Sequence, residues 1–179
     1  MTYTTLASIV KYPYSSALAA KKPKFGFFAS EAEDFQQIAQ ELGIKKLSEE
    51  GAPLRFARHP LVFLVEAADD ICYQMMDIED AFKLKLLTFD EAKDLYQGFF
   101  DEGKKKRADE VCHLVTDKNE QIAYLRATVI GILIQECTRV FIENEAEILE
   151  GTFVDALIKC IHPALKEAYQ RCSKTALDK

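Results

Sequence analysis

Glycine and proline are scarce in this chain, and their scarcity constrains the fold more than any other feature. Only 7 glycines and 5 prolines occur among 179 residues, so little interrupts a helical hydrogen-bond ladder. The apolar–polar alternation that is typical of strands is rare. Hydrophobic residues make up 49% and charged residues 29% of the chain, as in folded globular proteins. We therefore expect an all-α fold, a helical bundle.

Two capping boxes and one proline mark where helices should begin. In a capping box, the hydroxyl of the first residue accepts a hydrogen bond from the backbone amide of the residue three positions later. The carboxylate of that later residue in turn accepts from the backbone amide of the first residue. The boxes lie at Ser30 to Glu33 and at Thr88 to Glu91. The helix that starts at Ser30 should end at Gly43, since glycine readily closes a helix. Pro60 fits the first turn of a long helix that continues to about Lys83.

The spacing of apolar residues predicts the remaining elements. Helices are expected at about 3–12, 119–147 and 153–172, the last one bent near Pro163. The basic segment 103–107 is interpreted as a solvated turn. A loop at 15–28 carries a basic cluster of Lys21, Lys22 and Lys24. In the helix from Pro60, the predicted buried stripe consists of Leu61, Leu64, Val65, Ala68, Cys72 and Met75.

Charge, cysteine usage and the N-terminus limit the class of protein. The formal net charge of −6 argues against a broad nucleic-acid footprint, although a local basic pocket can still bind an anion. The five cysteines form no C-x-x-C pair, so we expect reduced, mostly buried thiols. No secretory signal pattern begins the chain, and the apolar run 129–134 is too short to cross a bilayer. These features predict a cytoplasmic protein without a membrane partner.

Three residues that can take part in chemistry recur at regular spacing in the helix predicted from Pro60, whose first turns are strongly apolar. Asp69, Tyr73 and Asp77 are spaced four residues apart, so they form a column along one helix face. Carboxylate oxygens can bind a metal or accept hydrogen bonds from hydroxyls, and a planar ring can pack on a sugar. The same spacing also occurs on a helix that only carries a polar flank. Spacing alone does not choose between these interpretations.

The literal sequence around this column carries further information. RHPLVFLVEAADDICY at 58–73 closely resembles a signature of bacterial dGTPase-like deoxynucleoside triphosphate triphosphohydrolases of the HD superfamily. LASIVKYP at 6–13 and KFGFFASE at 24–31 resemble two further segments of that family, in the same order. The resemblance covers about residues 3–80 by motif, and the remainder by helical pattern.

The resemblance implies a role for six residues. Asp69 matches the last aspartate of the family's metal site. Tyr73 matches a tyrosine that packs on the deoxyribose and leaves no room for a 2′-hydroxyl, and Asp77 matches a carboxylate that accepts the 3′-hydroxyl. Lys11 and Tyr12 match residues that line the triphosphate and sugar pocket. Lys24 matches a further phosphate contact.

The implied reaction is the attack of water on the α-phosphorus of a dNTP, with release of deoxynucleoside and intact triphosphate. It implies part of an HD-type phosphohydrolase fold, a divalent cofactor such as Mg²⁺ or Mn²⁺ and a homo-oligomer. The default substrate is dGTP. The resemblance leaves open which dNTP and which metal are used, and whether single-stranded DNA or another nucleotide acts as an effector.

The histidines depart from the family pattern. The family's metal ligands include a His and a His-Asp dipeptide, but none of His59, His113 and His162 precedes an aspartate. We interpret all three as capping, surface or structural residues. The chain is therefore expected to be an internal fragment of a longer protein, holding no metal and inactive by itself, since one carboxylate does not hold a metal tightly.

Two other interpretations and several details stay open. The chain can instead be a catalytically dead helical module that binds nucleotides or assembles with partner subunits, or a generic helical interaction domain. Arg126 and Arg139 can contact phosphate or a neighbouring subunit, or simply be exposed helix charges. Residues 1–179 are expected to form one all-α segment, with a motif-bearing half at 1–85 and a helical half at 86–179. Apolar faces left exposed by truncation predict self-association.

Overall fold

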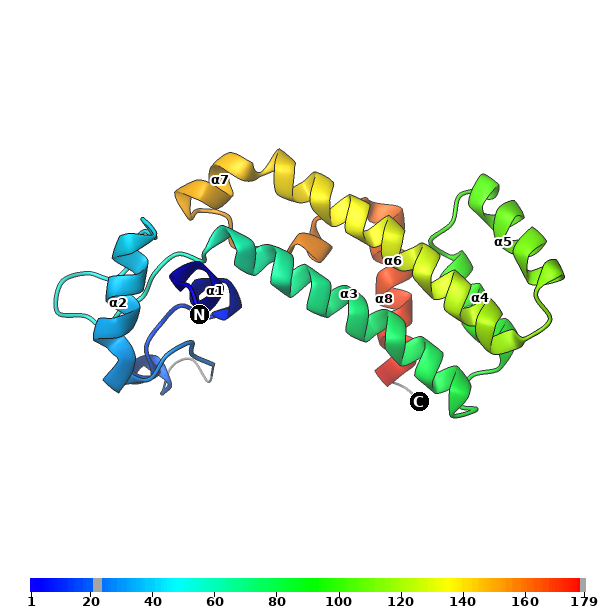
Figure 1. Cartoon of the computed structure of the whole chain (residues 1–179), viewed down its shortest axis with the longest axis horizontal. Helices are drawn as coiled ribbons and strands as arrows, with labels where there is room; N and C mark the ends of the chain where they lie inside the picture. The colour runs from blue at the N-terminus through cyan, green and yellow to red at the C-terminus, as the bar shows by residue number, and fades with distance from the viewer. Residues whose placement is uncertain (21–23, 178–179) are drawn as a thin grey trace. The chain divides into compact units, whose positions relative to one another are not determined.

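The computed structural model describes residues 1–20 and 24–177, so Lys21 and Lys22 of the basic loop lie outside the described residues. Within them the chain is helical, with isolated bridges but no β-strand, which confirms the all-α prediction (Figure 1). The α-helices are α1 (Tyr3–Ile9), α2 (Ala32–Glu41), α3 (Pro60–Lys83), α4 (Phe89–Gln97), α5 (Glu102–Leu114), α6 (Lys118–Glu143), α7 (Glu145–Glu150) and α8 (Pro163–Leu177). Short 3-10 helices lie at Ser16–Leu18, Ala29–Glu31 and Leu157–Lys159.

The chain divides into two compact units. Residues 1–66 and 141–156 form the first unit, and residues 67–140 and 157–179 form the second. Helices α3 and α6 each begin in one unit and end in the other. Each unit has its own buried core and is described by itself.

The first unit is built around an aromatic core. Phe27, Phe35 and Phe56 are buried together with Ala39, and the rings of Phe27 and Phe35 stack with centroids 4.5 Å apart. Gly26 precedes this core at a point of close approach, since a Cβ there would lie 2.3 Å from the carbonyl oxygen of Tyr12. Only glycine allows the two backbone segments to meet in this way.

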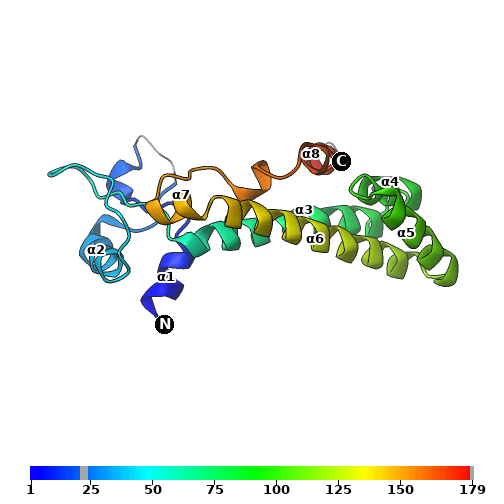
Figure 2. The same ribbon diagram turned by 90° about the horizontal axis from the view of Figure 1, so that it is seen from above.

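The second unit packs α3 against α6, which lie side by side in both views (Figure 1 and Figure 2). Apolar side chains at helical spacing are buried on both helices. They are Ile71, Met75 and Ile78 on α3, and Ile122, Leu125, Val129, Leu133 and Val140 on α6. Tyr96 of α4 is also fully buried, and its hydroxyl donates to the carbonyl oxygen of Met75 at 2.7 Å.

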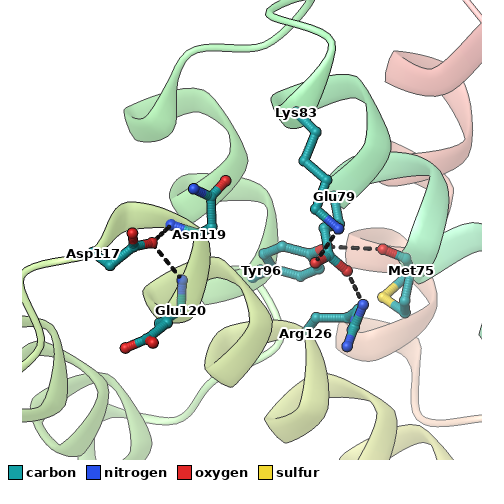
Figure 3. Close-up of polar contacts among 8 residues, drawn as sticks. All are labelled: Met75, Glu79, Lys83, Tyr96, Asp117, Asn119, Glu120 and Arg126. Carbon is teal, nitrogen blue, oxygen red and sulfur yellow. Dashed lines mark hydrogen bonds and ion pairs between the residues drawn. The ribbon is translucent and has the colours of Figure 1, made fainter.

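A carboxylate is buried in the second unit. Glu79 is only 5% exposed and pairs with Lys83 at 2.9 Å and with Arg126 of α6 (Figure 3). Two cations compensate the cost of removing this carboxylate from water. Arg126 is therefore held within the chain, while Arg139 pairs with Glu136 at 2.9 Å.

The predicted helix starts are partly confirmed. Pro60 is the first residue of α3, and the Thr88 box is present, with Glu91 Oε2 accepting from the Thr88 amide at 2.7 Å. The Ser30 box is wrong, because Glu31 accepts from the amide of Phe28 at 2.8 Å and thereby caps a 3-10 turn that precedes α2. A carboxylate in the first turn suits either register, so the sequence did not choose between them.

Three other predicted bounds are also wrong. The segment 103–107 lies inside α5, whose N-cap Asp101 accepts from the Lys104 amide at 2.8 Å. Helix α6 ends at Glu143, before a separate α7, and α8 begins only at Pro163. In α5, ion pairs three residues apart, such as Lys105 with Glu102, offset the run of like charge.

The predicted buried stripe of α3 is largely wrong. Met75 is buried as expected, but Leu61, Leu64, Val65, Ala68 and Cys72 are exposed. The buried face consists instead of Val62, Phe63, Glu66, Ala67, Ile71, Met75, Ile78 and Glu79. Because 61–68 is apolar nearly all round the helix, periodicity could not identify its buried side.

The cysteines also differ from expectation. All five are free, but only Cys137 and Cys172 are buried, while Cys72 and Cys160 are exposed. Burial raises the pKa of the Cys137 thiol to about 11 and that of Cys172 to about 12. The prediction of mostly buried thiols is wrong, and the prediction that the thiols are reduced stays a prediction.

Candidate functional site

The segment 11–14 leaves α1 and is fixed by backbone hydrogen bonds within the first unit. The Phe56 amide donates to the carbonyl oxygen of Pro13 at 2.8 Å, and the Gly26 amide donates to that of Tyr14 at 3.1 Å. These bonds, and the close approach at Gly26, hold the backbone from which the side chains of Lys11 and Tyr12 project. The backbone next to Lys11 and Tyr12 is therefore joined to two segments that lie farther along the chain.

Two ammonium groups lie near the ring of Tyr12. Lys24 Nζ is 5.5 Å from the ring centroid and Lys11 Nζ is 6.0 Å from it. At these distances the negative face of the ring attracts the cations. The structure thus gathers Lys11, Tyr12 and Lys24, the three predicted substrate contacts of the first unit.

A cleft of about 320 Å³ opens beside this cluster, entirely within the first unit. Its basic residues are Lys11, Arg55 and Arg58, and its lining includes no acidic residue. The other lining residues are Tyr12, Pro13, Tyr14, Leu47, Phe56, Ala57, Gly151, Phe153 and Val154. In a chain of net charge −6, this concentration of cations indicates a place for an anion.

A buried carboxylate holds two of these cations. Glu66, only 8% exposed, lies 3.0 Å from Lys11 Nζ through Oε1 and 2.9 Å from Arg58 Nη1 through Oε2. The guanidinium of Arg58 also lies 5.4 Å from the ring centroid of Phe63. The Glu66 carboxylate therefore helps to position both Lys11 and Arg58, which line the cleft.

The predicted column lies on α3 in the second unit. Asp69, Tyr73 and Asp77 are all exposed, and the Tyr73 side chain is 68% exposed. Neither Asp69 nor Asp77 forms an ion pair with a residue in 1–20 or 24–177. Their predicted roles toward a metal and a sugar therefore stay predictions.

Comparison with known proteins covers the whole chain. No protein-family model matches it. A protein named deoxyguanosinetriphosphate triphosphohydrolase-like from Pseudomonas aeruginosa (strain LESB58) is 34% identical over 183 residues, covering 100% of this chain but 40% of the relative. A protein of the same name from Synechocystis is 34% identical over 178 residues, covering 93% of this chain and 38% of the relative.

A third relative carries the name without the suffix. The deoxyguanosinetriphosphate triphosphohydrolase of Yersinia enterocolitica is 28% identical over 191 residues, covering 93% of this chain and 35% of the relative. The resemblance to dGTP triphosphohydrolase-like proteins is confirmed. The chain spans about 40% of the length of the Pseudomonas relative. The similarity reaches well beyond the motif-bearing residues 3–80.

The three histidines have local partners. His59 Nδ1 accepts from the Leu61 amide at 3.2 Å at the start of α3, and His162 Nδ1 accepts from the Ala164 amide at 3.3 Å at the start of α8. His113 Nδ1 lies 2.7 Å from the carbonyl oxygen of Asp109. The predicted capping role of His59 is confirmed.

The donor set of this chain does not fit a metal by itself. Among residues 1–20 and 24–177, no group of three or more His, Cys, Asp or Glu side chains could hold an ion. A transition-metal site needs several such ligands around one point. Among the described residues, Asp69 therefore lacks the further ligands that its predicted metal role would require.

The sequence motifs identify neither the two arginines of the cleft, Arg55 and Arg58, nor the Glu66 carboxylate that pairs with Arg58. Glu66 and Arg58 stand within the signature string, for which the resemblance implies no role at these two positions, and Arg55 lies outside all three resemblance segments. A signal was present, since Glu66 interrupts the apolar run 61–68 and a buried carboxylate requires a partner. Nothing in the sequence identified Lys11 as that partner.

Proposed function

We propose that this chain supplies the nucleotide-binding part of a deoxynucleoside triphosphate triphosphohydrolase. The proposed reaction is the attack of water on the α-phosphorus, which breaks the bond to the 5′-oxygen and releases deoxynucleoside and triphosphate. The observation that carries this proposal is the cleft of the first unit, where Lys11, Arg55 and Arg58 line one hollow without an acid. The names of the relatives provide the substrate class.

The cleft suits the charged half of such a substrate. A triphosphate carries several negative charges that repel one another, and cations placed close to its oxygens offset that repulsion. Lys11 and Arg58, ordered by Glu66, offer donors whose positions are set before the anion arrives. The ring of Tyr12 beside the ammonium groups of Lys11 and Lys24 offers a flat apolar surface for a sugar.

The α3 column supports the remaining part of the proposal. Tyr73 packs on the deoxyribose and excludes a 2′-hydroxyl, and Asp77 accepts the 3′-hydroxyl. Asp69 acts as one ligand of a divalent metal whose other ligands lie elsewhere. The exposure of all three side chains leaves them available for these roles.

A catalytically dead module is the second candidate function, favoured by the exposed apolar residues on α3. Leu61, Leu64, Val65 and Met76 are exposed at helical spacing around the column, as on a face that assembles with another protein. The sequence of a longer protein that contains this chain distinguishes the two candidate functions. The presence of a His and a His-Asp pair in that protein would favour the enzyme, and their absence would favour the catalytically dead module.

Binding experiments on the chain test the proposal. Isothermal titration with dGTP and GTP should show tighter binding of dGTP, and Lys11→Ala should weaken dGTP binding about tenfold. Tyr73→Ala should bring the two affinities together, whereas Tyr73→Phe should keep them apart. Lys46→Ala is the control, because Lys46 is exposed in the same unit and does not line the cleft.

The reaction has its own test. A longer protein that contains this chain should release deoxyguanosine and inorganic tripolyphosphate from dGTP, as resolved by anion-exchange chromatography. Pyrophosphate or orthophosphate as the first product would contradict the proposed bond cleavage. Undetectable dGTP binding by the chain would contradict the role of the cleft.

A further inference from the structure

The backbone of Arg55 forms hydrogen bonds and a bridge with other segments of the first unit. Its amide donates to Ser48 Oγ at 3.2 Å, and its carbonyl oxygen accepts from the Leu47 amide at 2.8 Å. An isolated antiparallel bridge also joins Arg55 to Tyr14. The side chain that lines the cleft therefore leaves a fixed point of the chain.

The charge of Arg55 is not compensated within the described chain. Lys11 and Arg58 share the Glu66 carboxylate, whereas the guanidinium of Arg55 has no ion-pair or hydrogen-bond partner in residues 1–20 and 24–177. Three cations and one buried carboxylate leave the cleft with an excess of positive charge. Like charges gathered in one hollow repel each other, and a bound anion would relieve that repulsion.

We propose that Arg55 binds phosphate oxygens of a polyphosphate ligand in this cleft, beside Lys11 and Arg58. A planar guanidinium presents paired N–H donors that match two oxygens of one phosphate, which an ammonium cannot do. The inference rests on the proposed function and deepens it, because it assigns a residue that the motifs do not contain. It also defines the ligand class, a chain of linked phosphates that meets all three cations.

Titration with two inorganic anions tests the inference without any reaction. Tripolyphosphate should bind the chain, Arg55→Ala should weaken it about tenfold, and Arg55→Lys should restore only part of the loss. Orthophosphate, which carries less charge and fewer oxygens than tripolyphosphate, should bind less tightly and respond less to Arg55→Ala. Lys46→Ala should change neither affinity. Like Arg55, Lys46 is exposed and its backbone forms an isolated bridge, in this case with Phe56, but Lys46 lies outside the cleft.

The outcomes separate this inference from the proposed function. If tripolyphosphate binds and Lys11→Ala weakens it while Arg55→Ala does not, the inference is overturned and the proposed function stands. If tripolyphosphate does not bind the wild-type chain, both are overturned. If Arg55→Ala melts early, Arg55→Lys and Arg55→Gln replace it, and full affinity in Arg55→Gln overturns the inference.

Discussion

Lys11 Nζ and Glu66 Oε1 lie 3.0 Å apart, and this ion pair joins the segment that follows α1 to the first turns of α3. Two of the three resemblance segments meet at this ion pair, since Lys11 belongs to LASIVKYP and Glu66 to the RHPL segment. Glu66 is buried, and its other oxygen accepts from Arg58. The pair therefore connects the core of the first unit to the cationic lining of its cleft.

Replacing Glu66 with glutamine should destabilise the first unit. The neutral amide cannot compensate the charges of Lys11 and Arg58. The loss of stability is smaller than for a fully buried unpaired charge, because the Lys11 side chain is 37% exposed and keeps some contact with water. We expect a loss of about 1–3 kcal/mol in the free energy of unfolding, measured by urea denaturation. Glu49→Gln, at an exposed loop position, should change it little, and equal stability of the two variants would contradict a structural role for the Glu66 charge.

Replacing Arg126 with methionine should destabilise the second unit. Glu79 would keep Lys83, which is half exposed, but would lose the arginine of α6 that approaches its other oxygen. We expect a loss of about 1–3 kcal/mol. Combining Arg126→Met with Glu79→Gln should cost less than the sum of the single changes, because the double variant leaves no buried charge unpaired and the half-exposed Lys83 stays solvated. Strict additivity in thermal unfolding would show that the pair contributes nothing.

Acidification should weaken the start of α3 through His59. Burial lowers the pKa of His59 below its usual value, and the neutral ring is also the form whose Nδ1 accepts from Leu61. The folded state binds its proton less readily than the unfolded state. This contribution is therefore complete above the unfolded pKa of about 6.5 and is lost as pH falls through the lower folded pKa.

Unfolding measured between pH 7.5 and 5 tests the role of His59. His59→Asn keeps a capping acceptor that does not titrate, so it should flatten the part of the pH dependence that His59 contributes. His59→Ala should remove the cap at every pH, at a cost of about 1 kcal/mol near neutrality. An unchanged pH profile in His59→Asn would assign the dependence to other groups.

Thiol labelling should divide the cysteines by burial. At pH 8, an aromatic disulfide reagent should react quickly with the exposed Cys72 and Cys160, because the thiolate is the reactive form and both are accessible. Cys137 and Cys172 should react only on unfolding, since burial raises their pKa to about 11 and about 12. Peptide mapping by mass spectrometry identifies the labelled sites. Early labelling of Cys172 in the native protein would contradict the packing of α8.

The sequence predicted the class of fold and many helix ends for local reasons. A hydroxyl and a carboxylate at Thr88 and Glu91, or a proline at position 60, act within one turn and need no partner from elsewhere. Where two local solutions are nearly equal, as at Ser30 and Glu31, local chemistry gave the wrong one. The buried side of α3 was also wrong, because an all-round apolar segment has no preferred face until its neighbours are placed.

For the candidate site, the motifs identified single residues but not their surroundings. Lys11, Tyr12 and Lys24 were assigned by resemblance, and the structure places them around one ring. The cleft, its Arg55 and Arg58, and the Glu66 carboxylate behind it depend on contacts between distant segments. The metal role of Asp69, the sugar contacts of Tyr73 and Asp77, and the division of the chain at residue 85 stay predictions.

The amino-acid sequence determined what depends on near neighbours: helical structure, the helix starts marked by Pro60 and by the Thr88 box, and the motifs that resemble dGTP triphosphohydrolase-like proteins. Helix formation depends on hydrogen bonds and caps between residues a few positions apart, so the amino-acid sequence alone can specify it. The tertiary structure alone decided which face of α3 is buried and which cations share a carboxylate. Burial and ion pairing depend on distances through space, and these exist only once segments far apart in the chain have packed together.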